Sequence, residues 1–318
     1  MCGIYGFTYP LKNPEKWLGM MGDVQAHRGP DGEGSFIRPE IAMGMRRLSI
    51  IDISKGNQPF FNASKTVAVI CNGEIYNYVE LREELKLRGH EFRTNNDIEV
   101  LPHLYDEYGL DFVRHLNGMF AIALYDMEAG TLHLVRDRLG IKPLYYAFFK
   151  GELFFASELK SITELNIIKP GLNYKALSTY LEMLYIPTPY TPFENIFKLD
   201  SGTVLSWKDK KPVFSKYWDI ASDASYLIDT EEEAKFQIEK ILLDSARMEM
   251  RSDVPVGAFL SGGVDSSAVT AFAARQSEKP LSTFHVNWGK GSEKMNESKF
   301  AKEVSEQYGT RHSEMGIS

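Results

Sequence analysis

The stretch FAIALYDMEAGTLHLV at residues 120–135 decides the fold class predicted for this chain of 318 residues. Its two apolar runs, residues 120–125 and 132–135, have the length and composition of β-strands. Ala129 and Gly130 lie in the short segment between them, and a break of this kind between two strands is typical of a hairpin. The stretch therefore predicts two adjacent antiparallel strands.

The same pattern continues on both sides of this hairpin. Residues 144–149 and 153–156 form a second pair of apolar runs around a turn at Lys150 and Gly151, and residues 67–71 form another buried run. So many apolar strand positions need cover on more than one face. We therefore expect an α+β sandwich in which two antiparallel sheets stack between outer layers of helices.

Two segments between these strands have the periodicity of helices. Asn77 and Glu80 have the spacing of a capping box, which predicts a helix over residues 78–88. A second helix is expected over residues 100–108 because its apolar positions repeat every three to four residues. A glycine follows each segment, where a helix would end.

Beyond residue 230 the pattern changes to strand and helix in alternation. Residues 256–260 and 281–286 have the composition of strands, and helices are expected after each of them, the second over residues 297–308. Alternation of this kind predicts a parallel sheet. Two strands make a small sheet, so we expect an incomplete α/β domain that ends where a third strand is due.

The boundary between the two patterns is expected after a segment that holds three prolines within residues 187–192. We expect a first domain over residues 1–210, a linker over residues 211–229 and a second domain over residues 230–318. At this length two hydrophobic cores are expected.

Composition excludes several classes of partner. Lys and Arg number 36 and Asp and Glu number 43, a net charge of −7, and no run of like charges marks a nucleic-acid surface. No stretch approaches the ~18 consecutive apolar residues of a membrane helix. Only Cys2 and Cys71 are present, too few for a disulfide framework, so we expect a cytoplasmic protein. From the charge and the apolar pattern we expect neither nucleic acid nor membrane as a partner.

Cys2 is the first candidate for chemistry. If Met1 is removed, one residue carries both a thiol with a pKa of about 8.5 and an α-amine with a pKa of about 8, so the amine can take the thiol proton. A nucleophile and its base in one residue suit attack on a carboxamide. Alternatively, Cys2 is a small apolar residue of a first strand.

Three further positions could hold an amide substrate. Asn72 and Gly73, at the end of a strand, could donate hydrogen bonds to an oxyanion, or could simply form a turn. The guanidinium of Arg47 could hold a carboxylate, or form a surface ion pair. Asp97 could hold an ammonium group, or cap a helix. Glutamine offers carboxamide, carboxylate and ammonium together.

A glycine-rich loop, SGGVDSS at residues 261–267, lies between a predicted strand and a predicted helix. Such a loop leaves backbone N–H groups free to bind an anion. It lacks the Lys of a Walker-type loop, so it is a different kind of phosphate loop. The alternative is a glycine-rich turn without a ligand.

Residues 1–160 resemble the glutamine amidotransferase domain of the glutamine-hydrolysing asparagine synthetases, a class II amidotransferase whose nucleophile is N-terminal. The motifs that carry the resemblance are Cys2, HRGPDG at residues 27–32, residues 47–51, NGEIYN at residues 72–77, Asp97 with Glu99, NGMFA at residues 117–121, and RDR at residues 136–138 with GIKPL at residues 140–144.

The resemblance implies an N-terminal-nucleophile fold that hydrolyses glutamine through a thioester on Cys2, with Asn72 and Gly73 as the oxyanion hole. It implies that the following residues bind glutamine: Arg47, Leu48, Ser49, Ile50, Ile51, Asn72, Gly73, Glu74 and Asp97. We interpret residues 27–32 as a structural loop near the site, because the amine of Cys2 already supplies a base.

The loop at residues 261–267 resembles the pyrophosphate loop of enzymes that split ATP between its α- and β-phosphates. The resemblance implies that ATP is bound by Leu260, Ser261, Gly262, Gly263, Asp265, Ser266 and Val286, with Asp265 also orienting Mg²⁺. The ammonia would then amidate an adenylated carboxylate, that of aspartate or of another acceptor such as a sugar acid. The chain lacks the family's downstream acceptor-binding segment, so a catalytically silent glutamine- or nucleotide-binding fragment is a further alternative. A second copy of the chain is a candidate partner.

Overall fold

The computed structural model describes residues 1–8, 11–221, 228–287 and 297–316. The chain divides into two compact units, Met1–Ala224 and Ser225–Ser318. Each unit is described below by itself.

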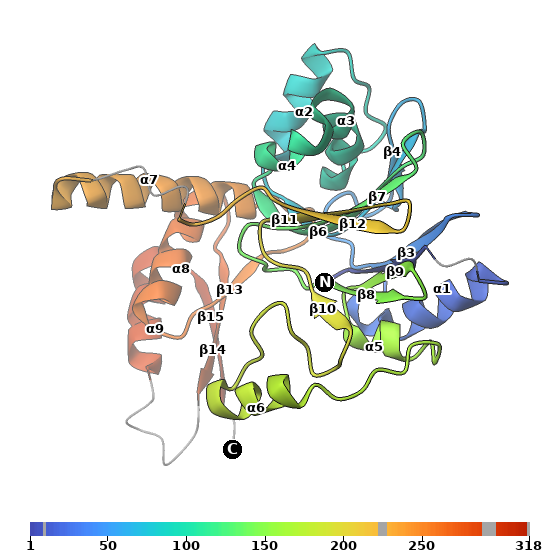
Figure 1. The fold of residues 1–318 in the computed structure, drawn as a ribbon. Coiled ribbons are helices and arrows are strands. Elements are labelled where there is room, and N and C mark those ends of the chain that lie inside the picture. Colours follow the sequence, from blue (N-terminus) through green and yellow to red (C-terminus); the bar gives the residue numbers. More distant parts are fainter. Residues whose placement is uncertain (9–10, 222–227, 288–296, 317–318) are drawn as a thin grey trace. The chain divides into compact units, whose positions relative to one another are not determined.

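The first unit contains two antiparallel sheets of six strands each (Figure 1). The first sheet has the order β10 (Ile196–Lys198), β8 (Tyr145–Phe149), β9 (Glu152–Ala156), β1 (Gly3–Phe7), β3 (Ile41–Arg47), β2 (Gly32–Arg38). The second has the order β12 (Lys211–Lys216), β11 (Thr203–Lys208), β7 (Thr131–Arg136), β6 (Gly118–Asp126), β5 (Val67–Ile75), β4 (Phe60–Phe61).

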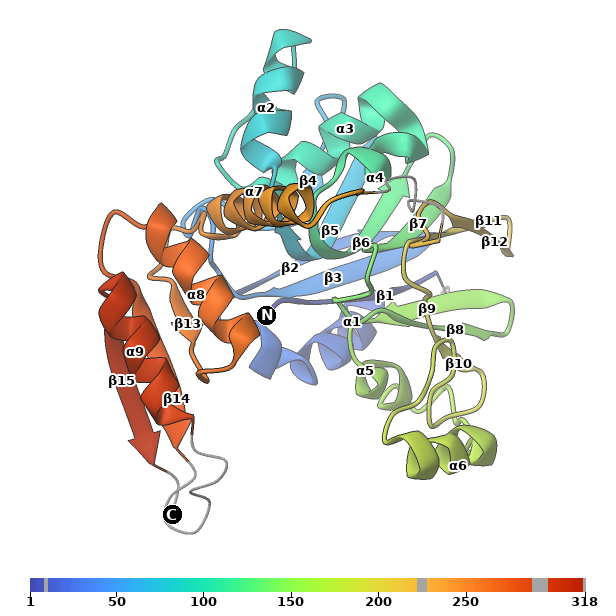
Figure 2. The same ribbon diagram turned by 90° about the vertical axis from the view of Figure 1, so that its left-hand side faces the viewer.

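Helices cover the outer faces of both sheets, as Figure 2 shows most clearly. One layer of helices packs on the second sheet: α2 (Tyr78–Leu87), α3 (Val100–Tyr108) and α4 (Phe112–His115). The other packs on the first sheet: α1 (Pro14–Asp23) and α5 (Leu159–Thr163). A further helix, α6 (Tyr174–Met183), follows α5 in the chain. The expected sandwich of two antiparallel sheets between helical layers is confirmed.

Alternation along the strands explains how three apolar clusters form. In β5, Val69 and Cys71 belong to the cluster beneath α2 and α3, whereas Ala68 and Ile70 belong to the cluster between the sheets. Successive side chains of a strand point to opposite faces, so a run of consecutive apolar residues is buried on both sides. Ile4 of β1 completes the central cluster from the first sheet.

The predicted hairpin at residues 120–135 is present as β6 and β7, paired antiparallel from Ala121 opposite Arg136 to Asp126 opposite Thr131. Residues 211–216, expected in a linker, instead form β12, which pairs along its whole length with β11. The sheet therefore continues past the expected boundary at residue 210. Residues 222–227 of the expected linker lie outside the described part of the chain.

The second unit has a parallel sheet of three strands, β13 (Gly257–Phe259), β14 (Ser282–Asn287) and β15 (Arg311–Gly316), in that order. Its helices are α7 (Glu231–Glu249), α8 (Val264–Gln276) and α9 (Ser298–Tyr308). The parallel sheet is confirmed, but the expectation of two strands was too low. Residues 311–316 are mostly polar and exposed, with Met315 as their single large apolar residue, so they lack the apolar pattern by which a strand is recognised.

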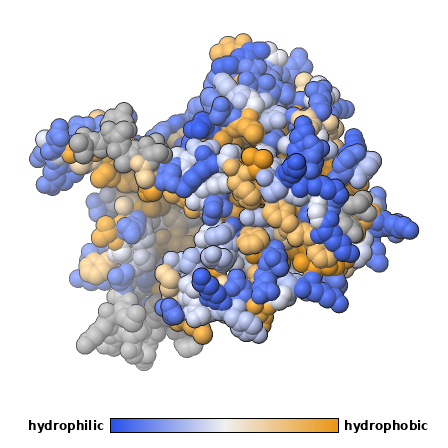
Figure 3. Space-filling view, in the orientation of Figure 1, coloured by the Kyte–Doolittle hydropathy of each residue, from blue (hydrophilic) through white to orange (hydrophobic). Residues whose placement is uncertain are grey.

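The surface of the first unit over α2 and α3 is mainly hydrophilic (Figure 3). Hydrophobic side chains remain exposed elsewhere, as on β12, where Val213 and Phe214 are 62% and 48% exposed. Within the described residues, none of the helices combines the length and the apolar character needed to cross a membrane.

Candidate active site

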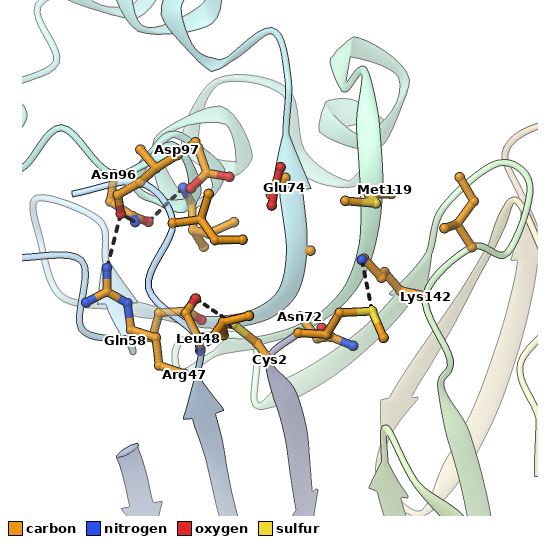
Figure 4. Close-up of a pocket in the computed structure, with 16 residues that line it drawn as sticks. Cys2, Arg47, Leu48, Gln58, Asn72, Glu74, Asn96, Asp97, Met119 and Lys142 are labelled. Carbon is orange, nitrogen blue, oxygen red and sulfur yellow. Dashed lines mark hydrogen bonds between the residues drawn. The ribbon is translucent and has the colours of Figure 1, made fainter. Parts of the chain in front are cut away.

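A pocket of about 480 Å³ opens where β1 begins and where β3 and β5 end (Figure 4). It lies in the first unit and takes residues from segments far apart in the sequence. The lining residues are Met1, Cys2, Arg47, Leu48, Ile50, Ile51, Gln58, Asn72, Gly73, Glu74, Asn96, Asp97, Ile98, Met119, Ile141 and Lys142.

Cys2 immediately precedes β1, and its sulfur faces this pocket (Figure 4). The backbone N–H of Leu48 donates a hydrogen bond to Cys2 Sγ at 3.3 Å. Burial raises the pKa of the Cys2 thiol above its usual value, because a thiolate loses hydration there. An unassisted thiolate is therefore scarce at neutral pH, and the site needs a base.

The segment at residues 27–32 fixes the backbone of Cys2. Arg28 Nε donates to the carbonyl oxygen of Cys2 at 2.9 Å. Glu158 holds the other end of this side chain through Arg28 Nη1 at 3.2 Å, and also accepts from His27 Nε2 at 2.9 Å. His27 and Arg28 therefore share Glu158 as a partner.

Met1 lines the pocket together with Lys142. Lys142 Nζ donates to Met1 Sδ at 3.6 Å, one of the contacts drawn in Figure 4. Burial lowers the pKa of the α-amine at the start of the chain, since an ammonium group loses hydration. A larger fraction of the Met1 α-amine is therefore in its neutral form at neutral pH than for an exposed amine.

Asn72 lies in β5 and is 1% exposed. Its Nδ2 donates to Ser157 Oγ at 3.4 Å, while its Oδ1 is buried and has no hydrogen-bond partner among the described residues. A half-turn of the amide exchanges these atoms: Oδ1 would then accept from the Ser157 hydroxyl, and Nδ2 would become an uncommitted donor. A buried polar group without a partner is costly, so this position favours a ligand that supplies one.

Gly73 is required by the approach of the neighbouring strand. A Cβ at this position would lie 2.1 Å from the carbonyl oxygen of Met119 and 2.6 Å from Cα of Phe120. Only a residue without a side chain lets β5 and β6 remain paired here. Its backbone therefore lies in the wall of the pocket beside Asn72.

Arg47 uses its guanidinium to hold the loop that follows β3. Nη1 donates to the carbonyl oxygen of Ile53 and to Asn57 Oδ1, and Nη2 donates to the carbonyl oxygens of Ile51 and Asp52, all within 3.2 Å. These four bonds occupy both terminal nitrogens. The fork expected to hold a substrate carboxylate is thus engaged with the protein, and Nε is the remaining donor.

Asp97 is 3% exposed and lies at the pocket wall. Its Oδ2 accepts from the backbone N–H of Ile75 at 2.9 Å. Burial, with the charge of Glu74 as a further contribution, raises the pKa of the Asp97 carboxyl to about 7. A cationic ligand beside Asp97 would stabilise the charged form of this buried carboxyl. Asn96 caps the short helix Asp97–Glu99 by accepting from the N–H of Ile98 at 3.0 Å.

Among the predicted glutamine-site residues, only Ser49 does not line the pocket: its N–H donates to Asp31 Oδ2 at 2.8 Å. Sequence reasoning gave no role to Lys142, although it lies in the GIKPL motif, nor to Gln58 or Asn96. Gln58 Oε1 accepts from the N–H of Cys71 at 2.6 Å, a contact between loop and strand that no local pattern reveals.

In the second unit, the loop at residues 261–267 joins β13 to α8. Ser261 and Ser266 brace it, with their Oγ atoms 2.8 Å apart, and Ser261 Oγ accepts from the N–H of Gly263 at 3.2 Å. Gly262 has φ +95°, and a Cβ there would lie 2.5 Å from the carbonyl oxygen of Glu297. The loop thus needs glycine for its shape, as a backbone cradle for an anion does.

The remaining residues predicted to bind ATP lie near this loop. Leu260 follows β13 and its side chain is buried. Its backbone N–H donates to the carbonyl oxygen of Phe284 at 2.8 Å and its carbonyl oxygen lies 3.0 Å from His285 Nδ1, so its backbone is engaged with the neighbouring strand. Val286 lies near the carboxyl end of β14, the edge of the sheet at which ligands bind in α/β folds. Asp265 is exposed in the first turn of α8. One exposed carboxylate suits Mg²⁺ that is held mainly by phosphate oxygens.

Two family models match the chain. The model of the glutamine amidotransferase domain matches residues 1–218, and the asparagine synthase model matches residues 237–318. Among solved structures, the glutamine phosphoribosylpyrophosphate amidotransferase of B. subtilis, complexed with ADP and GMP, has a TM-score of 0.53 and 15% identity, covering 95% of this chain and 79% of its own. This likeness, together with the paired antiparallel sheets, confirms the expected N-terminal-nucleophile type of fold.

Two curated relatives show how much of a longer protein this chain resembles. Asparagine synthetase [glutamine-hydrolyzing] 1 of Bacillus subtilis is 37% identical over 295 residues, which cover 91% of this chain and 46% of the relative. Putative asparagine synthetase [glutamine-hydrolyzing] 2 of Methanocaldococcus jannaschii is 36% identical over 339 residues, covering 98% and 64%. The chain thus spans about half to two thirds of the length of these relatives. Because the glutamine amidotransferase model matches more than half of its residues, the chain belongs to the glutamine amidotransferase domain family.

Proposed function

We propose that the first unit hydrolyses glutamine to glutamate and ammonia, with Cys2 as the nucleophile. The observation that carries the proposal is the position of the Cys2 sulfur in one pocket with Asn72, Gly73 and Asp97. A nucleophile, donors for an oxyanion and an anion for an ammonium group are the parts that this reaction requires.

With Met1 removed, the α-amine of Cys2 takes the proton of the thiol, and the thiolate attacks the side-chain amide carbon of glutamine. The tetrahedral intermediate collapses as the C–N bond breaks, and the ammonium group returns its proton to the leaving nitrogen. This gives ammonia and a γ-glutamyl thioester. Water then attacks the thioester, the amine accepts a proton from it, and glutamate leaves with the thiol restored. The raised pKa of the buried thiol explains why a base beside it is needed.

The negative charge of each tetrahedral intermediate needs fixed donors. The Asn72 side chain, turned so that Nδ2 faces the pocket, and the backbone of Gly73 are the proposed oxyanion hole. The unpartnered buried position at Asn72 Oδ1 supports this role, since an oxyanion would accept from Nδ2 once the amide has turned. Donors of this kind typically contribute about 10²–10³-fold in kcat.

The α-ammonium of glutamine is the proposed partner of Asp97, whose pKa of about 7 would fall on pairing with a cation. Glu74 lines the same pocket and adds negative charge. The α-carboxylate would lie near Arg47, which holds the loop after β3 and so shapes the backbone at Leu48, Ile50 and Ile51 rather than offering a free fork.

For the second unit we propose binding of ATP at the loop of residues 261–267, with Asp265 holding Mg²⁺. The ammonia would then amidate a carboxylate that ATP has adenylated. Aspartate is the proposed acceptor, giving asparagine, AMP and pyrophosphate, and the names of the relatives support this choice. A sugar acid would be amidated by the same chemistry.

Ammonia release by the full chain tests the proposed hydrolysis, after mass spectrometry has established which residue begins the mature chain. Cys2→Ala should abolish release, whereas Cys71→Ala, at a buried thiol inside β5, should retain it. Equal rates for Cys2→Ala and the parent would refute the assignment. Glutamine binding in calorimetry without any ammonia would indicate a silent binding module instead.

A further inference from the structure

A pair of histidines meets outside the pocket described above. His90 follows α2 and His103 lies in α3, two helices that run beside each other in the same layer (Figure 1). Their Nδ1 atoms are 3.1 Å apart, and the rings meet edge to face at 80°. Asp106 lies one turn beyond His103 on α3, and one ligand atom from each of the three residues lies within 4.8 Å of the others.

We propose that His90, His103 and Asp106 bind a divalent transition-metal ion, for which Zn²⁺ is the best fit. The donors are two imidazole nitrogens and a carboxylate oxygen, the ligand types that Zn²⁺ takes in proteins. With Zn–N bonds of about 2.0–2.1 Å, two nitrogens of a tetrahedral shell are roughly 3.3 Å apart. The observed 3.1 Å therefore needs only a small outward movement.

Neighbouring side chains hold two of the three ligands, His90 and Asp106, in place. His90 Nε2 lies 2.9 Å from Glu107 Oε1, which is the arrangement of carboxylate, histidine and metal found around bound ions. Arg88 Nη1 fixes Glu107 by donating to its other oxygen at 3.1 Å. Asn62 Nδ2 donates to Asp106 Oδ1 at 2.8 Å, which orients the third ligand.

The proton between the two histidines is the one that the metal would replace. Because the Glu107 carboxylate accepts, neutral His90 carries its proton on Nε2 and offers Nδ1 as an acceptor. His103 must then donate from Nδ1. When Zn²⁺ binds, His103 changes tautomer: its proton moves from Nδ1 to Nε2 by exchange with solvent, the ring stays neutral, and both Nδ1 atoms become ligands.

Such an ion would link His90, in the segment that connects α2 to α3, with two residues of α3. His90 stands near the start of this connection, and Asn96 and Asp97 near its end line the glutamine pocket. Bound metal should therefore raise the thermal midpoint of the first unit, because it binds the folded state and the ligands separate on unfolding.

Calorimetry with ZnCl₂ on the full chain carrying Cys2→Ala tests the site, because this background removes the accessible thiol as a competing ligand. The expected stoichiometry is one tight Zn²⁺ per chain. Co²⁺ should bind in its place without the charge-transfer band that a thiolate ligand produces. His90→Asn should abolish tight binding, and Glu107→Gln should weaken it about 10- to 100-fold.

His115→Asn is the matched control, because this exposed histidine of α4 lies outside the cluster and its loss should leave the affinity unchanged. Asp106→Asn, at an exposed residue, gives a second disruption that should not impair folding. The proposal is overturned if the parent binds no stoichiometric Zn²⁺, or if both His90→Asn and Asp106→Asn bind it as tightly as His115→Asn does.

Discussion

Asp97→Asn should stabilise the protein while it removes glutamine binding. The Asp97 carboxyl is buried and its pKa is raised from 3.8 to about 7. In the unfolded chain the carboxyl ionises at its ordinary pKa, so between these two values the folded state binds the extra proton. The stability associated with protonated Asp97 is complete at pH values below 3.8 and is lost as the pH rises through about 7.

The size of the effect follows from the difference in pKa. At about 1.4 kcal/mol for each unit, the raised pKa of Asp97 lowers the free energy of unfolding by about 4 kcal/mol at pH 8, where the folded protein must bury the charge. At pH 5 the loss is about 2 kcal/mol, because the carboxyl is protonated in the folded state but ionised in the unfolded chain. Asn keeps an oxygen that can accept from the N–H of Ile75, at 2.9 Å in the parent, but has no charge to bury. The variant should therefore gain free energy of unfolding, and gain more at pH 8 than at pH 5.

Urea unfolding of the full chain at both pH values measures this gain. Trp17, Trp207 and Trp218 lie in the same unit as Asp97, so fluorescence in a Trp288→Phe background reports on that unit alone. Asp111→Asn is the control, because this exposed carboxylate should change stability little at either pH. A gain that does not grow from pH 5 to pH 8, or a loss of stability at pH 8, would refute the reasoning.

Three other substitutions test single parts of the site. Asn72→Ala should lower kcat for ammonia release by about 10²–10³-fold with a much smaller change in KM. A rise in KM as large as the fall in kcat would argue against an oxyanion donor. Gly73→Ala should destabilise the first unit in urea, because the new Cβ meets the carbonyl oxygen of Met119, whereas Gly19→Ala, in open space within α1, should stabilise it by up to about 1 kcal/mol. Arg28→Lys should lower kcat about 10- to 100-fold by releasing the carbonyl of the nucleophile, and unchanged kinetics would show that this contact is dispensable.

The central strands could be predicted from the sequence because burial on both faces makes them continuously apolar. Residues 67–71 of β5 and residues 120–125 of β6 are such runs. The edge strands could not. In β2 only Phe36 is fully buried, and β12 is exposed throughout and rich in lysine. The turn before β12 places Asp209 and Lys210 at positive φ without a glycine, so the usual sign of a hairpin is missing and the segment has the composition of a linker.

The pocket residues that belong to recognisable sequence motifs could be predicted. Cys2, Asn72 and Asp97 do line one pocket. The engagement of Arg47 with its own loop was not predictable, because it depends on where four acceptors at residues 51–57 fold in space. Lys142 was missed for a similar reason, since it is a buried cation whose neighbours come from distant segments.

The central claim is that Cys2 acts with its own α-amine as the base. Two forms of the full chain, one beginning at Cys2 and one retaining Met1, should be separated, verified by mass spectrometry and assayed for ammonia release from glutamine. The form that begins at Cys2 should release ammonia, and the form that retains Met1 should release none above background. Equal rates from the two forms would contradict it.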